Sequence, residues 1–142
     1  MDHRPWTIDW LLTENQLFVF LAQPIRSDMH NFRKLRVYEL SLDVAEAVYR
    51  YSSRFDASER YNLTDQLRRC AVSVPSNIAE GCGRTSDKDA ARFVSNALGS
   101  AYETETQLVL ASRLGYRRDD SLLERVIALQ KQLRAFYDHL TR

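Results

Sequence analysis

The sequence has few of the residues that build covalent cross-links and metal centres. Its 142 residues include only two cysteines, Cys70 and Cys82, which are too few to staple a secreted mini-domain and lack the paired spacing of a zinc site. Three histidines, His3, His30 and His139, are scattered and form no Glu-x-x-His pair of the kind that di-iron bundles use. We therefore expect no metal, no cofactor and a reducing, cytoplasmic compartment.

Helix breakers, net charge and long apolar runs are also scarce. The chain has 4 glycines and 3 prolines, a composition that favours long helices over turn-rich folds. A formal net charge of +1 gives no general attraction to nucleic acid or to an anionic membrane, so any basic surface must be local. The apolar run at residues 17–22 is far shorter than the roughly 20 residues of a membrane span, so neither anchoring nor export is expected.

Residues 1–28 differ from the rest of the chain. They hold both tryptophans, Trp6 and Trp10, whereas regular patterning opens at Met29. We expect this segment to be an N-terminal extension upstream of a natural start at Met29. The alternative is a short N-terminal helix or arm packed on the domain, because two tryptophans seldom lie in a solvated tail. Residues 29–142 are expected to form one bundle domain.

Between residues 29 and 142, apolar residues recur at three- and four-residue steps, the period of an amphipathic helix. Four such segments are joined by short connections, which predicts an all-α, up-down-up-down antiparallel four-helix bundle without strands. The predicted helices begin near Val37, near Leu63, at Ser86 and at Ser121, and the core stripe of the fourth is Leu122, Val126, Leu129, Leu133, Phe136 and Leu140.

Local signals mark the ends of these helices. Ser86 and Ser121 each precede an acidic residue by three positions, as in a capping box. Gly81 and Gly83 are expected to stop the second helix. Pro75 lies inside that helix and removes a backbone donor, so we expect a kink there.

The first and third helices carry more packing surface than one bundle needs. A monomeric bundle buries a single stripe per helix, but the first helix has a second apolar line beside its core stripe, which predicts burial against another subunit or partner. The third helix has small residues at its midpoint that let another helix approach closely. The predicted oligomer interface comprises Tyr38, Leu42, Tyr49, Gly99 and Glu103.

The second and third helices resemble those of a known family. Residues 66–81, QLRRCAVSVPSNIAEG, closely resemble the signature of the bacterial four-helix bundle proteins first noted as open reading frames within intervening sequences of 23S ribosomal RNA genes. Residues 32–35 resemble the opening of that family, and residues 97–100 and 114–116 resemble its third helix. The resemblance covers residues 29–142.

The resemblance implies a homo-oligomer, expected to be a pentameric ring or barrel of bundles, with no established enzymatic activity. The nearest understood relatives of the family are the accessory variability determinants of diversity-generating retroelements, which are similar pentameric barrels that bind nucleic acid and a reverse transcriptase. By analogy, we expect the partners to be further copies of the chain, RNA or DNA, and a reverse transcriptase.

The sequence offers little for catalysis, and no catalytic residue is expected. Glu103 and Glu105 point about 200° apart on a helix, so within one chain they cannot share a proton or a metal. Cys70 falls on the buried side of its helix and is expected in the core. Cys82, between two glycines at a helix end, is expected to be exposed and reactive, with no disulfide to Cys70.

Cationic residues near the helix ends are candidates for holding phosphates. A modest excess of positive charge per subunit is multiplied around a ring, and the planar guanidinium group of arginine binds phosphate oxygens well. The competing interpretation is ordinary pairing on helix surfaces, because Asp65, Glu80 and Asp89 each precede an arginine by three or four positions. Aromatic residues of the kind that single-strand binders use are missing from these segments. The candidates are Arg33, Lys34, Arg36, Arg68, Arg69, Arg84, Lys88 and Arg92.

Two hypotheses for function follow. The leading one is a non-enzymatic oligomeric scaffold that binds RNA or DNA, or a nucleic-acid enzyme, through an arginine-lined surface of the assembled ring. The alternative is a purely protein-binding homo-oligomer whose arginines close subunit contacts. A small-molecule site in the central channel of the ring is a weaker third interpretation, for which the sequence names no ligand.

Overall fold

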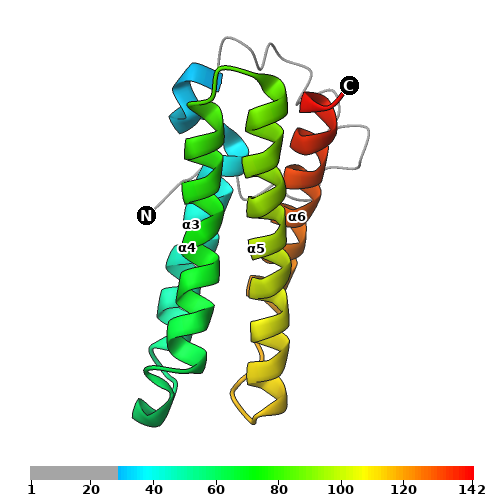
Figure 1. The fold of residues 1–142 in the computed structure, drawn as a ribbon. Helices are drawn as coiled ribbons and strands as arrows, with labels where there is room; N and C mark the ends of the chain where they lie inside the picture. The colour runs from blue at the N-terminus through cyan, green and yellow to red at the C-terminus, as the bar shows by residue number, and fades with distance from the viewer. Residues whose placement is uncertain (1–28) are drawn as a thin grey trace, which may run out of the picture.

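Four long helices make up most of the chain (Figure 1). The computed structural model describes residues 29–142, and the predictions for residues 1–28 fall outside this range. Within the described range no strand is present, so the predicted all-α four-helix fold is confirmed. The elements are the 3-10 helix η2 (Met29–Lys34), helix α3 (Arg36–Ser52), the 3-10 helix η3 (Ala57–Glu59), and helices α4 (Leu63–Cys82), α5 (Asp87–Arg113) and α6 (Asp120–Leu140).

The helices pack around one core. Helix α4 lies between α3 and α5, and α6 closes the circuit by packing against α5 and α3. Figure 1 places η2, the α4–α5 connection and the C-terminus at one end of the bundle, which we call the upper end. The α3–α4 and α5–α6 connections lie at the opposite, lower end.

The predicted apolar stripes line the core. All six stripe residues of α6, from Leu122 to Leu140, are buried. On α5 the buried side chains are mostly small, and Ala97, Ala101 and Ala111 are completely enclosed. Small side chains let two helix backbones approach closely, so this face of α5 can accept a neighbouring helix at short range.

The contact between α4 and α5, which we call the α4–α5 seam, is close and partly polar. At its upper end, a Cβ atom on Gly81 would lie 3.1 Å from the Phe93 Cβ and 3.2 Å from the Ala90 carbonyl oxygen. A larger residue there would require α5 to shift by a few tenths of an ångström. Farther down, three side-chain hydrogen bonds cross the seam: Ser73–Ser100 at 2.9 Å, Cys70–Thr104 at 3.3 Å and Gln66–Gln107 at 3.0 Å.

Helix α4 ends later than predicted. It runs through Gly81 to Cys82, with Gly83 as its C-cap, so the prediction that Gly81 stops the helix is wrong. The reason is the α4–α5 seam, because Gly81 serves close helix packing and not chain reversal. Pro75 lies inside this helix, and the kink expected there stays a prediction.

The observed N-cap residue matches the prediction in α5 and differs from it in α6. Ser86 caps α5, and its hydroxyl accepts a hydrogen bond from the Asp89 backbone N–H at 3.2 Å, as predicted. In α6 the cap is Asp119, whose carboxylate accepts from the Leu122 N–H at 2.9 Å, so the prediction of Ser121 as the cap is wrong. Aspartate is as good an N-cap as serine, and here it starts the helix earlier in the chain.

An aromatic cluster ties the two connections of the lower end together. Phe55 in the α3–α4 connection stacks on Tyr116 in the α5–α6 connection, with ring centroids 4.3 Å apart. The Tyr116 hydroxyl also donates to the Asp56 carboxylate at 3.2 Å. These contacts fix the path of the chain as it enters the turn before α4.

Two glycine-to-alanine substitutions test the α4–α5 seam. Gly81→Ala should lower the free energy of unfolding by about 1–3 kcal/mol, because both atoms near the new methyl group belong to or adjoin the α5 backbone. Gly83→Ala is the matched control at the end of the same helix. The nearest atom to its Cβ position is the Glu80 carbonyl oxygen at 3.5 Å, an ordinary contact, so it should change the free energy of unfolding by less than about 0.5 kcal/mol. Urea denaturation measures both, and an equally small effect of Gly81→Ala would contradict the close approach.

Candidate nucleic-acid interface

The structure divides the eight predicted cationic residues into two groups. Arg68 and Arg69 lie in the first half of α4, toward the lower end. A rise of about 1.5 Å per residue separates Arg69 from Arg84 by roughly 22 Å, so the eight residues do not form a single patch. The other six lie toward the upper end, in η2, at the start of α3, in the α4–α5 connection and in the first turns of α5: Arg33, Lys34, Arg36, Arg84, Lys88 and Arg92.

Part of the upper group lines an open groove between α5 and α6, here called the α5–α6 groove. Its volume is about 550 Å³. Its charged lining residues are Lys88, Arg92 and Arg142, and no carboxylate side chain is among the described residues that line it. This surface suits an anion such as a phosphate. The remaining lining residues are Ala91, Ser95, Asn96, Tyr137, Leu140 and Thr141.

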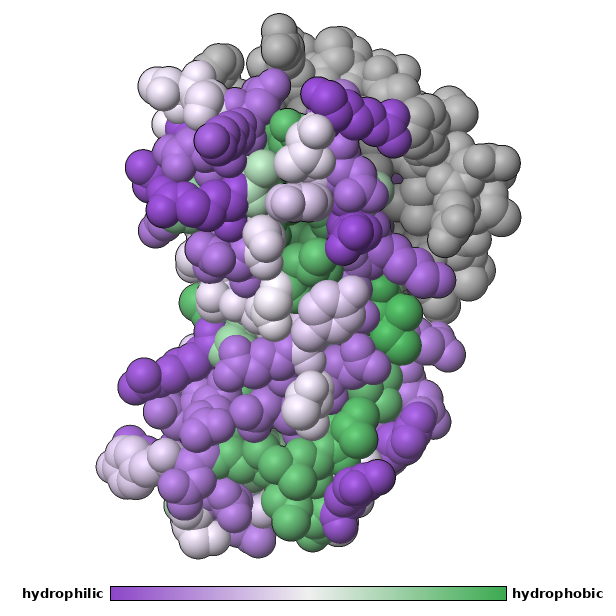
Figure 2. Space-filling model, turned by 45° about the vertical axis from the view of Figure 1, so that its right-hand side comes forward, coloured by the Kyte–Doolittle hydropathy of each residue, from purple (hydrophilic) through white to green (hydrophobic). Residues whose placement is uncertain are grey.

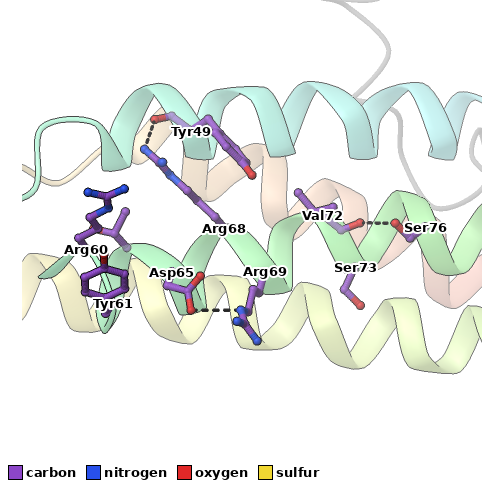
Figure 3. A pocket seen from close by; sticks show the side chains of 10 residues that line it. Tyr49, Arg60, Tyr61, Asp65, Arg68, Arg69, Val72, Ser73 and Ser76 are labelled. Carbon is purple, nitrogen blue, oxygen red and sulfur yellow. Dashed lines mark hydrogen bonds and ion pairs between the residues drawn. The ribbon is translucent and has the colours of Figure 1, made fainter.

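A second open groove, the α4 groove, follows the outer face of α4 and has a volume of about 540 Å³ (Figure 3). Three arginines line it, Arg60, Arg68 and Arg69, against one carboxylate, that of Asp65. Figure 3 shows that Tyr49 enters the groove from α3, whereas Arg60 and Tyr61 enter from the turn before α4. The remaining lining residues, all on α4, are Thr64, Val72, Ser73 and Ser76.

Arg68 is engaged within the fold. Its Nε donates to the Ser52 hydroxyl at 2.8 Å, and a terminal nitrogen donates to the Tyr49 carbonyl at 3.5 Å. The guanidinium also lies over the Tyr49 ring, 4.6 Å from its centroid. A cation is stabilising at this place, because the last carbonyls of α3 carry partial negative charge. Arg68 therefore joins α3 to α4 and holds Tyr49 in the groove.

Surface pairing, the competing interpretation, accounts for part of the arginine set. Arg69 lies 3.1 Å from Asp65, and Arg92 lies 2.9 Å from Asp89, as the spacing predicts. Arg84, expected to pair with Glu80, instead lies 4.0 Å from Asp89, because α4 ends at Cys82 and the chain turns toward α5.

These pairs leave the arginines available to a ligand. The Arg69 side chain is 79% exposed even with its partner in place. Exposed pairs of this kind contribute about 0–1 kcal/mol each, so a phosphate can replace the carboxylate partner at small cost. The observed pairing is therefore compatible with either interpretation of the arginines.

The predicted interface residues lie on opposite sides of the bundle. On α3, Leu42 and Tyr49 are 40% and 47% exposed. On α5, Gly99 and Glu103 face away from the core and are exposed. Tyr38 is half-buried and packs edge-on against Phe32 at 4.9 Å, so much of its surface is already covered within the chain.

An exposed apolar strip near the lower end was missed at the level of sequence. Figure 2 shows hydrophobic surface gathered on the lower part of the face that α5 and α6 form. The strip could have been found from periodicity, because Val109 and Leu110 lie off the inner stripe of α5 that Leu108 continues. The exposed apolar residues there are Val109, Leu110, Leu114 and Ile127.

Tyr61 was also missed, although it follows Arg60 directly and lies only a few residues before Arg68 and Arg69. The structure brings two aromatic residues to the α4 groove, Tyr49 from α3 and Tyr61 from the turn. No local pattern in the sequence signals the place of Tyr49, which depends on how α3 packs against α4.

Both cysteines are buried. Cys70 is in the core, as predicted, and it is hydrogen-bonded by the Thr104 hydroxyl. The prediction that Cys82 is exposed and reactive is wrong, since its exposed fraction is 3%. Helix α4 continues through this residue and turns its side chain into the core. Burial raises the pKa of the Cys82 thiol to about 11, and both cysteines are free thiols.

Within one chain, Glu103 and Glu105 lie on different faces of α5, as their spacing predicts. Glu105 accepts a hydrogen bond from the Gln130 side chain of α6 at 2.6 Å, whereas Glu103 is exposed on another face. Within residues 29–142 no three His, Cys, Asp or Glu side chains gather closely enough to hold a metal ion. In the same range, none of the helices has both the length and the hydropathy to cross a membrane.

Comparison with known families decides the classification. A model of the family described as 23S rRNA-intervening sequence protein matches residues 33–135. The chain belongs to this family. The part shared with the 23S rRNA-intervening sequence proteins includes both cationic groups and all of the α4 groove, and it stops within α6 before Arg142. No curated protein matches the chain.

The burial of both cysteines predicts slow thiol chemistry. At pH 8, a thiol with a pKa of about 11 is only about one-thousandth thiolate, the form that reacts. In the folded protein, neither Cys70 nor Cys82 should react readily with a disulfide reagent that releases a coloured thiol, and the rate should rise at least about 100-fold in denaturant. One thiol that reacts at the rate of a free cysteine in the folded state would contradict the placement of Cys82.

Proposed function

We propose that this protein is a non-enzymatic, homo-oligomeric scaffold that binds nucleic acid, or an enzyme acting on nucleic acid such as a reverse transcriptase, through its arginine-rich grooves. The observation that carries the proposal is the local separation of charge. On a chain whose net charge is only +1, two open grooves are each lined by three cationic residues against at most one carboxylate.

Phosphate groups fit these grooves better than other anionic groups do. Five of the six cationic lining residues are arginines, whose planar fork matches two phosphate oxygens at once. The grooves are open and extended, which suits a polymer more than a compact metabolite.

The oligomer we propose is a closed ring, specifically a pentamer of up-down-up-down bundles. In a ring, each subunit shows two different surfaces to its two neighbours. Helices α3 and α5 are diagonal in the bundle, each lying between α4 and α6, so their outer faces point in different directions. Leu42 on α3, and Leu110 with Gly99 on α5, thus provide exposed residues on two separate surfaces. The proposed number of five subunits is taken from the family resemblance.

A purely protein-binding scaffold is the second candidate. The observation that favours it is the exposed apolar strip near the lower end, since large apolar patches commonly mark protein contacts. In this alternative, the arginines of the grooves close subunit contacts and do not hold phosphates. The two candidates differ in whether the purified oligomer retains RNA or DNA at low salt.

Salt dependence tests nucleic-acid binding. Binding of a labelled RNA or DNA should weaken steeply as salt rises, because each neutralised phosphate releases counterions. The double variant Lys88→Gln/Arg92→Gln should reduce the slope of log K against log salt by about 2. Arg50→Gln is the matched control, because Arg50 is 78% exposed, pairs with Glu46 and lies outside both grooves. Absence of binding at low salt would contradict the proposal and favour the protein-binding scaffold.

Sedimentation tests the ring. The unmodified protein should sediment as a pentamer at micromolar concentration, whereas Leu42→Glu and Leu110→Glu should each dissociate it, because a charge would be buried in either of two distinct contacts. Ser58→Glu, at an exposed position in η3, should leave the assembly intact. Circular dichroism checks that each variant keeps its helices. A folded, monomeric unmodified protein would contradict the oligomer.

A further inference from the structure

The α4 groove gathers two tyrosines and three arginines on one open surface. Tyr61 is 80% exposed, and the Arg60 guanidinium lies 5.4 Å from the centroid of its ring. Tyr49 is 47% exposed, and the Arg68 guanidinium lies 4.6 Å from the centroid of its ring. Arg69 completes the set on α4 (Figure 3). Two aromatic rings and three arginines therefore line one open groove.

Each component of this surface has a matching chemical group on a single strand of nucleic acid. An exposed tyrosine ring offers a flat face on which any unpaired base can stack, and arginines along the same surface hold the phosphates of its backbone. In a duplex, the faces of the bases are covered by their neighbours, so exposed tyrosines would gain nothing. Exposed tyrosines beside arginines thus favour an unpaired strand over a duplex.

We infer that the α4 groove binds single-stranded nucleic acid, with an unpaired base stacked on Tyr61 and backbone phosphates held by Arg60 and Arg69. The inference rests on the proposed function and narrows its ligand to strands with unpaired bases. RNA and DNA share the chemistry that the groove recognises, namely a phosphodiester backbone and flat bases.

The length and charge of the groove agree with this occupant. From the start of α4 to Ser76, the helix rises by roughly 20 Å, enough for a short stretch of single strand. The lining has three arginines and one carboxylate, and that carboxylate, on Asp65, is already the partner of Arg69. A polyanion therefore meets attraction along the groove.

The arginines of the groove have different roles. Arg60 and Arg69 are exposed, and the partner of Arg69 is an exposed carboxylate that a phosphate can displace. Arg68 is a positioning residue, because its hydrogen bonds to Ser52 and to the Tyr49 carbonyl hold the second ring in place. Loss of Arg68 would affect the fold of this corner, so the decisive variants avoid it.

The test compares a single-stranded oligonucleotide with the duplex of the same sequence, by fluorescence anisotropy, on the full chain. Tyr61→Ala should weaken single-strand binding about tenfold, because a stacked base is lost, and should leave duplex binding unchanged. Tyr61→Trp should retain single-strand binding, since tryptophan also offers a flat ring. Tyr61 is 80% exposed, so neither substitution should disturb folding.

Tyr102→Ala is the matched control for loss of an exposed ring, because Tyr102 is 50% exposed on α5 and lies outside both grooves. Tyr102 shares a face of α5 with Gly99, so sedimentation checks that the assembly stays intact. Binding of both oligonucleotides should be unchanged. The double variant Arg60→Gln/Arg69→Gln should weaken binding and reduce the slope of log K against log salt by about 2, because two phosphate contacts are lost. Running each measurement with RNA and with DNA identifies which of the two strands the groove prefers.

The outcomes separate this inference from the proposed function. Unmodified protein that binds neither single strand nor duplex at low salt contradicts the proposed function, and the inference fails with it. Unmodified protein that binds both equally, with Tyr61→Ala changing neither, contradicts the inference alone. An equal loss of both by Tyr61→Ala also contradicts it, because the ring would then act on something other than an unpaired base.

Discussion

The close approach of α4 to α5 is the constraint on which the rest of the structure depends. Gly81 and the alanines of α5 remove the side-chain bulk that would hold the two backbones apart. Hydrogen bonds such as Ser73–Ser100 then fix the register of one helix against the other. With one face of α4 committed to α5 and another to α3, the surface left toward solvent includes Arg69.

This packing converts a nearly neutral composition into a surface with separated charge. The core takes the apolar stripes, and the α4–α5 turn brings cationic residues from the end of one helix to the start of the next. The contact of Arg68 with Tyr49 fixes α3 against α4 and completes the α4 groove. Net charge alone gives no reason to propose phosphate binding, and the proposal depends on the local arrangement of arginines.

Much of the fold followed from the sequence, because helical periodicity is a local property. The stripe of α6 and the cap at Ser86 were predicted residue by residue. The errors came at residues whose role is set by packing against a distant part of the chain. Gly81 was interpreted as a stop signal although it serves packing against α5, and Cys82 was consequently placed at the surface. Tyr49 joins the candidate site only through the packing of α3 against α4, so no spacing pattern could reveal it, whereas Tyr61 follows Arg60 directly and could have been found in the sequence.

The most direct test of the account is photo-crosslinking of a thiouridine-labelled single-stranded oligonucleotide, followed by mapping of the crosslinked tryptic peptides. Cleavage after Arg60 and Arg68 releases Tyr61 within one short peptide. The account predicts that this peptide carries the main crosslink and that unlabelled single strand, but not duplex, competes it away. Crosslinks confined to peptides outside both grooves, or no crosslink at low salt, would contradict it.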